Sequence, residues 1–182
     1  KGADRAIHIC DKTSAPKDPL QLATAIVSAI KNQHFDLLLT GLQSDDLGFG
    51  QTAIVIAEQL GLPHTSMAME LTCKENGLQI ERELEAGWRQ TLELPLPCVL
   101  SIQSGVNKPR YANMKGILAA KKKPIEKIEA ASLLSVDNVP SQTIERIYEP
   151  QKLKQTVMLK GEPDSIATEL LNILDTGSTD RQ

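Results

Sequence analysis

The feature of the sequence that most constrains the fold is a mostly apolar run of strand length, Phe35 to Thr40. Such a run is typical of a strand that is covered on both faces of a parallel sheet. Before it, Asp18 and Pro19 form an N-cap and first-turn pair, and apolar residues then recur on one face of a helix to about Gln33. After it, a second helix is predicted to begin at residues 50–52. Alternating strands and helices predict an α/β fold with right-handed crossovers and a doubly wound, mainly parallel sheet.

The pattern changes after residue 63, where turn signals separate three β segments. These segments span residues 66–72, 78–84 and 88–94, and we expect them to form an antiparallel β meander. Another buried strand is predicted at residues 98–102. Residues 121–150 mix charges, β-branched residues and prolines, which indicates an extended arm, and a last helix is predicted to begin near Asp164. We therefore expect a domain at residues 1–124 and a C-terminal arm and helix at residues 125–182.

Charge and composition exclude several classes of protein. The 182 residues include 20 Lys and Arg against 23 Asp and Glu, a net charge of -3, so no broad positive field is present and nucleic acid is not an expected partner. Apolar runs stop far short of the roughly 20 residues that span a bilayer, so no membrane insertion is expected. Three cysteines without CxxC spacing favour neither a disulfide framework nor a zinc site, which suits a reducing interior. The chain starts at Lys1 without an initiator Met or signal pattern, and we expect it to begin inside a domain.

The segment from Gly41 to Thr52 joins the carboxyl end of the first predicted strand to the amino end of the second helix, where open α/β sheets hold ligands. Its glycines let backbone N–H groups approach a ligand, and the helix start carries partial positive charge, so a phosphate could bind there. Asp45 and Asp46 would repel a phosphate unless they contact a ribose or cap the loop. Neither the P-loop ending nor the GxGxxG fingerprint is present, and a purely structural turn is the alternative. The candidate ligand-binding residues are Gly41, Gln43, Ser44, Asp45, Asp46, Gly48, Gly50, Gln51 and Thr52.

No catalytic or metal-binding set stands out in the sequence. The three histidines are isolated, and the three cysteines are expected to be core residues. We therefore expect no catalytic residues, no bound metal and no enzymatic activity of the chain itself. Glu81, Glu83 and Glu85 alternate along a predicted strand, which would place three carboxylates on one face. Such a face is either solvated or a polar surface for a partner.

The segment Val106 to Pro124, VNKPRYANMKGILAAKKKP, resembles the signature segment of the β subunit of electron transfer flavoproteins. The likeness lies in an NxPRY core, a GI pair near the start of a short helix and an AKKKP ending. It is supported, in the family's order, by Gly2 to Arg5, by the Gly41 to Thr52 loop and by Ile80 to Leu84 before a glycine turn. The resemblance covers essentially the whole chain, although the family's subunit is longer at the amino end by further strand and helix units.

The resemblance implies an α/β fold of the adenine-nucleotide-binding type and one subunit of a heterodimer. In that family the α subunit holds the redox FAD, while the β subunit binds AMP, or a second FAD in electron-bifurcating members, and docks on dehydrogenases. By position, the Gly41 to Thr52 loop is then the nucleotide site, with Gly50, Gln51 and Thr52 nearest the phosphate. The expected partners are the α subunit and dehydrogenases, in the cytoplasm of a bacterium or in the mitochondrial matrix of a eukaryote.

The resemblance also assigns residues to partner binding. Glu83 matches an acidic position that faces the mobile flavin domain of the α subunit, and residues 107–122 match the recognition loop and its helix. Met114 is expected to be an exposed apolar knob that docks on dehydrogenases, with a buried staple as the alternative. The expected partner-binding residues are Glu83, Asn107, Pro109, Arg110, Tyr111, Met114, Gly116, Ile117, Lys121 and Lys122. A stand-alone adenine-nucleotide module resembling universal stress proteins is the second interpretation, although such a module has no need for residues 107–123.

Overall fold

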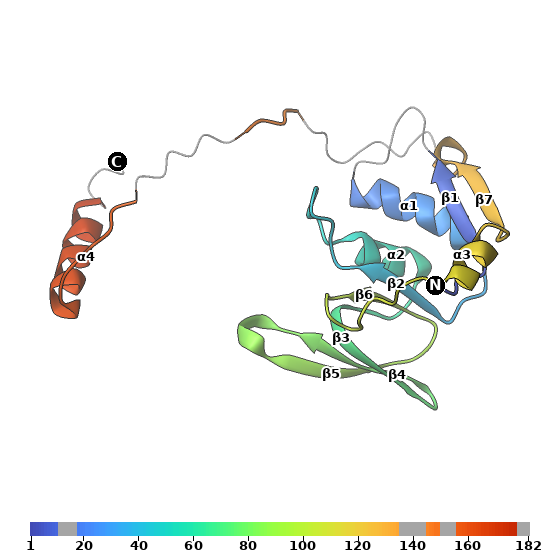
Figure 1. Ribbon diagram of the computed structural model, residues 1–182, viewed down its shortest axis with the longest axis horizontal. Helices are drawn as coiled ribbons and strands as arrows, with labels where there is room; N and C mark the ends of the chain where they lie inside the picture. The colour runs from blue at the N-terminus through green and yellow to red at the C-terminus, as the bar shows by residue number, and fades with distance from the viewer. Residues whose placement is uncertain (11–17, 135–144, 150–155, 178–182) are drawn as a thin grey trace. The chain divides into compact units, whose positions relative to one another are not determined.

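Two β-sheets and three α-helices make up the first of two compact units in the computed structural model, which describes residues 1–10, 18–134, 145–149 and 156–177 (Figure 1). This unit spans residues 1–144, and the second spans residues 145–182. The elements of the first unit are β1 (Ala6–Cys10), α1 (Pro19–Ile30), β2 (Leu37–Gly41), α2 (Thr52–Leu60), β3 (His64–Lys74), β4 (Gly77–Glu83), a 3₁₀ turn (Glu85–Gly87), β5 (Arg89–Leu94), β6 (Cys98–Ile102), α3 (Met114–Ala120), β7 (Ile125–Glu129) and a second 3₁₀ turn (Ala130–Ser132).

The larger sheet has five strands in the order β2-β6-β3-β4-β5. Its first three strands run parallel, with Leu37 opposite Cys98 and Gly41 opposite Ile102, whereas β3, β4 and β5 form an antiparallel meander. Both the α/β class with a mainly parallel arrangement and the meander were predicted from the sequence, and both are confirmed. The predicted strand at residues 98–102 is confirmed with the same bounds, because it is a buried apolar run between a turn and a polar stretch.

Helix α2 covers one face of this sheet, and α1 packs against α2. Ala53 and Ala57 of α2 contact Val99 of β6, so small side chains bring the helix close to the sheet. The opposite face of the sheet carries the second cluster of buried residues, which consists of Ala68, Leu78, Ile80, Cys98 and Leu100. Burial of these apolar side chains is the main stabilising contribution within the first unit.

The strand predicted at residues 35–40 is only partly covered on its two faces. Leu39 is 54% exposed, and β2 is an edge strand that pairs with β6 alone among the described residues. Leu38 faces the cluster under α2, whereas Leu37 packs against the cluster on the opposite face. The described part of the chain therefore buries only part of this apolar run and leaves Leu39 exposed.

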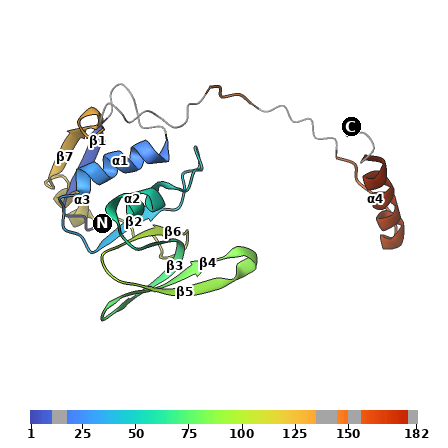
Figure 2. The same ribbon diagram turned by 180° about the vertical axis from the view of Figure 1, so that it is seen from behind.

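The smaller sheet pairs the beginning of the described chain with a strand that lies far along the sequence. β1 and β7 run parallel with Ala6 opposite Ile125, and in both views they lie beside α1 and α3 (Figures 1 and 2). Lys123 also forms an ion pair with Asp4, with Nζ and Oδ1 2.9 Å apart. The first compact unit thus continues past residue 124, where the sequence indicated the start of an arm.

Local capping explains where the helices begin. Asp18 accepts a hydrogen bond from the backbone N–H of Gln21 at 2.8 Å, and Pro19 occupies the first turn of α1, as predicted. Helix α1 ends at Ile30, earlier than the sequence pattern indicated. Helix α2 begins at Thr52, within the predicted range, and ends where Gly61 adopts a left-handed conformation with φ of 65°.

The second unit contains α4 (Pro163–Gly177), which begins one residue before the predicted start. Four of its apolar side chains are exposed: Leu170, Leu171, Ile173 and Leu174. No helix in the described ranges combines the length and the apolar character needed to cross a membrane.

Gly77, at the turn between β3 and β4, generates a test of the meander. Its φ is 151°, and a Cβ atom at this position would overlap the carbonyl oxygen of Leu94 on β5. We expect Gly77→Ala to lower the free energy of unfolding by about 3 kcal/mol, measured by urea titration. Gly87→Ala is the matched control, because Gly87 also has a positive φ but open space around it, and should cost about 1 kcal/mol. Equal costs for the two variants would contradict the close approach at Gly77.

The thiols provide a second test of the core. Cys98 is fully buried and its burial raises the pKa of its thiol, whereas Cys73 on β3 is exposed. Because the thiolate is the reactive form, Ellman's reagent should react with Cys98 at least about tenfold more slowly than with Cys73 in the folded chain at neutral pH. Cys73→Ser should remove the fast phase, and denaturant should release Cys98. A fast phase that persists in this variant, with Cys10 also replaced by Ser, would contradict the burial of Cys98.

Candidate functional site

The candidate ligand loop leaves the carboxyl end of β2 and enters the amino end of α2 (Figure 1). Gly48 and Gly50 have φ of 65° and 64°, a left-handed conformation that side-chain-bearing residues rarely adopt. The Gly48 N–H donates to the carbonyl oxygen of Ser44 at 3.0 Å, which closes the loop on itself. The loop thus presents backbone at the edge of the sheet where ligands of parallel α/β folds bind.

The amino end of α2 lacks a side-chain cap. Gln51 occupies the N-cap position without a side-chain hydrogen bond to the helix, whereas Asp18 caps α1 and Asn113 caps α3. The first N–H groups of a helix have no partner within the helix and carry partial positive charge. At α2 these donors are available to an acceptor from outside the helix.

A cavity of about 570 Å³ lies beside this helix end. Its wall comes from three sources: the apolar face of α1, the carboxyl half of β2, and the loop with the start of α2. Leu22 and Ile26 supply the wall from α1, and Thr52 contributes a hydroxyl close to the uncapped helix end. The volume falls within the range of about 300 to 1,000 Å³ typical of small-molecule sites, and the wall combines apolar surface with few polar groups.

The two acidic residues of the loop lie away from the cavity wall. Hydrogen bonds from the Ser44 side chain and from the backbone N–H of Leu47 lower the pKa of the Asp46 carboxyl, so this group is ionised at neutral pH. The bond from Leu47 to Oδ1 is 2.9 Å long. Asp46 thus caps its own loop. From the sequence, this role or contact with a ribose is the condition under which an acidic residue could lie near a bound phosphate.

The cavity collects some of the predicted ligand residues and omits others. Those that line it are Gly41, Gln43, Ser44, Gly50 and Thr52, whereas Asp45, Asp46, Gly48 and Gln51 do not. Sequence reasoning missed Asp18, Leu22, Ile26 and Ile30 of the α1 wall, together with Phe49 of the loop. Helical periodicity indicated the apolar face of α1, but it could not show that this face lies open beside the loop.

The segment that carries the family signature is exposed and positively charged. Residues 107–123 contain six Lys and Arg residues and no acidic residue, in a chain whose net charge is -3. Tyr111 is fully exposed and Met114, the first residue of α3, is 73% exposed. The alternative in which Met114 is a buried staple therefore does not fit. Asn113 holds the start of α3 by accepting from the Gly116 N–H at 2.7 Å.

The row of glutamates differs from the sequence-based expectation. Glu81 and Glu83 lie on β4 and share one face, but Glu85 lies in the 3₁₀ turn after the strand, so the prediction of three carboxylates on one strand face is wrong. The strand ends at Glu83 because the chain turns toward β5 over residues 85–87, where Ala86 has φ of 56°. Arg89 of β5 pairs with Glu81, with Nη1 and Oε2 3.5 Å apart.

The candidate loop and Glu83 lie at related positions in the sheet. Gly41 of β2 is opposite Ile102 of β6, and Gln103, the next residue, donates from Nε2 to Oε2 of Glu83 at 2.9 Å. The loop that follows Gly41 and the side chain that contacts Glu83 therefore leave the same edge of the parallel part of the sheet. Parallel pairing brings these two predicted sites to the carboxyl ends of neighbouring strands, although the sites are far apart in the sequence.

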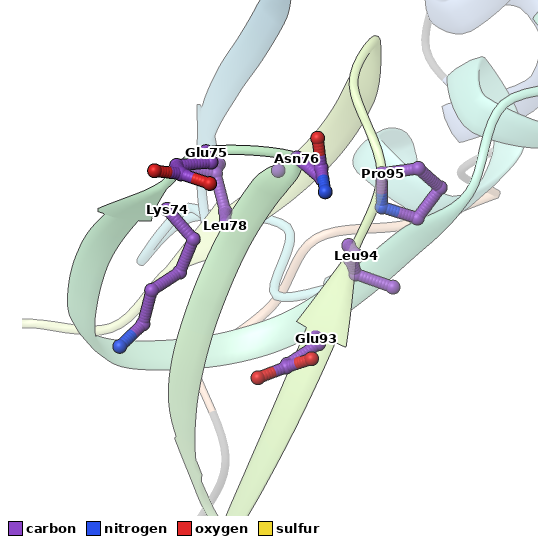
Figure 3. Close-up of a pocket in the computed structure, with 8 residues that line it drawn as sticks. Lys74, Glu75, Asn76, Leu78, Glu93, Leu94 and Pro95 are labelled. Carbon is purple, nitrogen blue, oxygen red and sulfur yellow. The ribbon is translucent and has the colours of Figure 1, made fainter.

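A second cavity of about 540 Å³ lies where the β3–β4 turn meets the end of β5 (Figure 3). Figure 3 shows Lys74 and Glu75 on one side of β4 and Leu94 and Pro95 on the other. The side chains of Lys74, Glu75, Asn76 and Glu93 are exposed, so this hollow offers solvated groups of both charges. It has neither an uncapped helix end nor a glycine loop, and we assign it no ligand.

The histidines and cysteines form no metal site within the described residues, where no three His, Cys, Asp or Glu side chains cluster. Cys98 is a core residue, as predicted, but Cys73 is exposed and Cys10 is intermediate, so the expectation of three core cysteines is wrong for those two. Cys73 lies at the end of β3, where Thr72 and Lys74 are also exposed. His8 lies near Cys10, with Nδ1 3.6 Å from the sulfur, because the two residues alternate on one face of β1.

Comparisons with known proteins agree on one family. A family model described as the electron transfer flavoprotein domain matches residues 1–133. The chain is 35% identical over 182 residues to the electron transfer flavoprotein subunit beta of Methylophilus methylotrophus, an alignment that covers 96% of this chain and 69% of that protein. The subunit beta of Bacillus subtilis (strain 168) is also 35% identical, with 95% and 68% covered. For the subunit beta of Mus musculus the identity is 33%, with 91% and 65% covered.

Proposed function

The chain belongs to the electron transfer flavoprotein family, as a relative of its β subunits, and from this premise we propose that it binds an adenine nucleotide in the cavity beside α2 and docks on dehydrogenases. The nucleotide is AMP or a second FAD. The FAD of the α subunit supplies the redox chemistry when the two subunits are assembled. The single observation that carries the nucleotide part is the uncapped amino end of α2 at the wall of the 570 Å³ cavity.

The residues at the cavity fit a nucleotide with its phosphate near Thr52. The free N–H groups at the start of α2 donate to phosphate oxygens, and the Thr52 hydroxyl adds a further donor in the same turn. The apolar wall from Leu22, Ile26 and Leu38 suits a flat base, since burying apolar surface stabilises the complex. Asp46 does not line the cavity, and the hydrogen bond from the Leu47 N–H to its carboxylate weakens its repulsion of a phosphate there.

The exposed segment at residues 107–123 supports docking on another protein. Met114 is an exposed apolar side chain in a segment with six Lys and Arg residues. The contact of Arg110 with the Lys1 carbonyl oxygen at 3.3 Å and the ion pair of Lys123 with Asp4 fix the segment to its own unit. Exposed apolar side chains ringed by charges are typical of a surface that recognises partners. We assign this role to Asn107, Pro109, Arg110, Tyr111, Met114, Gly116, Ile117, Lys121 and Lys122.

The C-terminal region is assigned to the contact with the α subunit. Leu170, Leu171 and Leu174 of helix α4 are exposed in the second unit. Val157 and Met158, which precede this helix, are exposed as well. Apolar side chains in such numbers favour burial against another chain. In this proposal the arm and helix within residues 125–182 pack on the α subunit.

A stand-alone adenine-nucleotide module is the second candidate function, because it would use the same cavity. It would not need the cationic segment at residues 107–123, and the matching relatives are named as subunits. The visible absorbance of protein purified together with its neighbouring gene product distinguishes the two, since only the subunit would carry flavin through its partner.

Thr52→Val tests the nucleotide site. The change removes a hydroxyl with little change in volume, and we expect it to weaken binding by about 1 to 2 kcal/mol, the scale of one hydrogen bond to a charged group. Calorimetry with AMP and with FAD measures the effect and shows which nucleotide is preferred. Thr72→Val, at an exposed position on β3, is the matched control and should bind as the wild type does. Equal affinities of the Thr52 variant and the control would refute the assignment.

Met114→Ala tests the docking segment. Because Met114 is 73% exposed, the change should leave the melting temperature nearly unchanged, whereas docking on a cognate dehydrogenase should weaken by about 1.5 to 3 kcal/mol, the scale of burying one Met. Leu96→Ala is the control, since Leu96 is an exposed apolar residue that lies outside residues 107–123 and outside the C-terminal region. A drop in melting temperature with unchanged docking would show that Met114 stabilises its own domain instead.

A further inference from the structure

The carboxylate of Glu83 is held by a neutral side chain. Gln103 donates from Nε2 to Oε2 of Glu83 at 2.9 Å, and both residues are half-buried. The other end of the same amide is also occupied, because Oε1 of Gln103 accepts from the backbone N–H of Ser104 at 2.9 Å. A flipped amide would set two oxygens against each other and lose both bonds. The Gln103 amide therefore has one favourable orientation, with its donor toward Glu83.

An irregularity in β3 lets these two side chains meet. Glu83 ends β4 and Gln103 follows β6, so β3 lies between them in the sheet. The pairing of β3 shifts register against both neighbours around Ala68, and Met67 has φ of 60°, which a regular strand does not contain. The backbone N–H of Gln103 donates to the Ala68 carbonyl oxygen at 2.9 Å. The bulge in β3 thus anchors Gln103 at the position from which its amide reaches Glu83.

The cation across the strand pair does not form an ion pair with Glu83. Arg89 lies directly opposite Glu83 in the β4–β5 register, where a cross-strand ion pair would be expected. Its guanidinium instead pairs diagonally with Glu81 at 3.5 Å. Among the described residues, Glu81 thus has a cationic partner, and Glu83 has only the amide of Gln103. On this strand face, the charge of Glu81 is therefore compensated by Arg89, whereas the charge of Glu83 is not compensated by a cation in the described part of the chain.

We propose that Gln103 is a positioning residue that fixes the orientation of the Glu83 carboxylate while leaving its charge available to a cationic group of the α subunit. The inference rests on the proposed function as a subunit that pairs with an α subunit. It takes Glu83 as the residue that faces the flavin domain of that partner, the position that the family resemblance gives to Glu83. A neutral donor suits this role better than a cation would, since a Lys or Arg at position 103 would orient the carboxylate but cancel its charge. An apolar residue would preserve the charge but leave the side chain free to rotate.

The test uses the heterodimer with the α subunit and follows the reduction of its flavin by a cognate dehydrogenase in stopped flow over a range of ionic strength. Gln103→Met removes the amide with little change in shape and should slow reduction about fivefold while the salt dependence is retained, because the charge remains. Gln103→Lys should slow reduction and flatten the salt dependence, as Glu83→Gln should. Gln90→Met, at an exposed position on β5, is the matched control and should behave as the wild type.

A double-mutant cycle separates positioning from a general effect on the fold. In the Glu83→Gln background, Gln103→Met should have no further effect on the rate, since the carboxylate that it positions is gone. An effect of Gln103→Met that persists undiminished in that background would overturn the inference, as would a wild-type rate for Gln103→Met alone. A wild-type rate and salt dependence for Glu83→Gln would overturn both the inference and the partner role of Glu83. Nucleotide binding and dehydrogenase docking are measured separately, with the Thr52 and Met114 variants, so the two parts of the proposed function can hold even if this inference fails.

A second measurement applies if Gln103→Met does not fold. In the nitrogen–proton NMR spectrum of the heterodimer, the side-chain amide protons of Gln103 should resonate apart from those of the exposed Gln90, because one of them donates to a carboxylate. Glu83→Gln, a change at the end of a strand, should shift the Gln103 resonances and leave those of Gln90 in place. Unshifted Gln103 resonances would overturn the inference.

Discussion

The parallel pairing of β2 with β6 is the constraint on which the candidate sites depend. With Gly41 opposite Ile102, the loop that follows β2 and the residues that follow β6 leave the sheet at one edge. Helix α2 returns from the loop and packs Ala53 and Ala57 onto Val99 of β6, so the amino end of the helix is fixed at the same edge. β6 thus contributes to both sites, because it pairs with the strand that leads to the uncapped helix end and is followed by Gln103, which bonds to Ala68 of β3. A shift of this register by one residue would move both sites and turn the buried side chains of β6 to the opposite face.

Charge is distributed unevenly over the first unit, in agreement with the proposal that one surface docks on dehydrogenases and another faces the α subunit. The charged residues of the segment at 107–123 are all cationic, whereas Glu81 and Glu83 are anionic side chains on one face of β4. Partners of different charge can therefore be recognised by different surfaces of the same subunit, because each surface attracts one sign and repels the other. The net charge of the chain, -3, conceals this separation.

Local signals in the sequence predicted the features that depend on neighbouring residues. Asp18 and Pro19 gave the start of α1, and the apolar run from Cys98 to Ile102 gave β6, because caps and buried runs are encoded over a few positions. Features that depend on distant residues could not be predicted in this way. The apolar face of α1 was visible as a periodicity, but its position as a wall of the cavity depends on how α1 packs on α2.

The bulge in β3 and the role of Gln103 were likewise beyond local reasoning. Nothing in the residues around Met67 indicates a positive φ, since the irregularity arises where β3 must pair with β6 in parallel and with β4 in antiparallel fashion. The family resemblance identified Glu83 as a position of interest but not the amide that holds it. The placement of Glu85 beyond the strand end shows the same limit, because period-two alternation in a sequence does not mark where a strand stops.

The pairing of β1 with β7 has a consequence for how the chain folds. Ala6 is opposite Ile125, a partner that lies 119 positions later, so the two strands can join only after nearly all of the first unit has been made. Contacts between such distant positions carry a large entropic cost of loop closure and form slowly. The meander of β3, β4 and β5, in contrast, joins neighbours in the sequence. During synthesis, β1 therefore emerges before β2 to β6 but finds its partner only after all of them have been made.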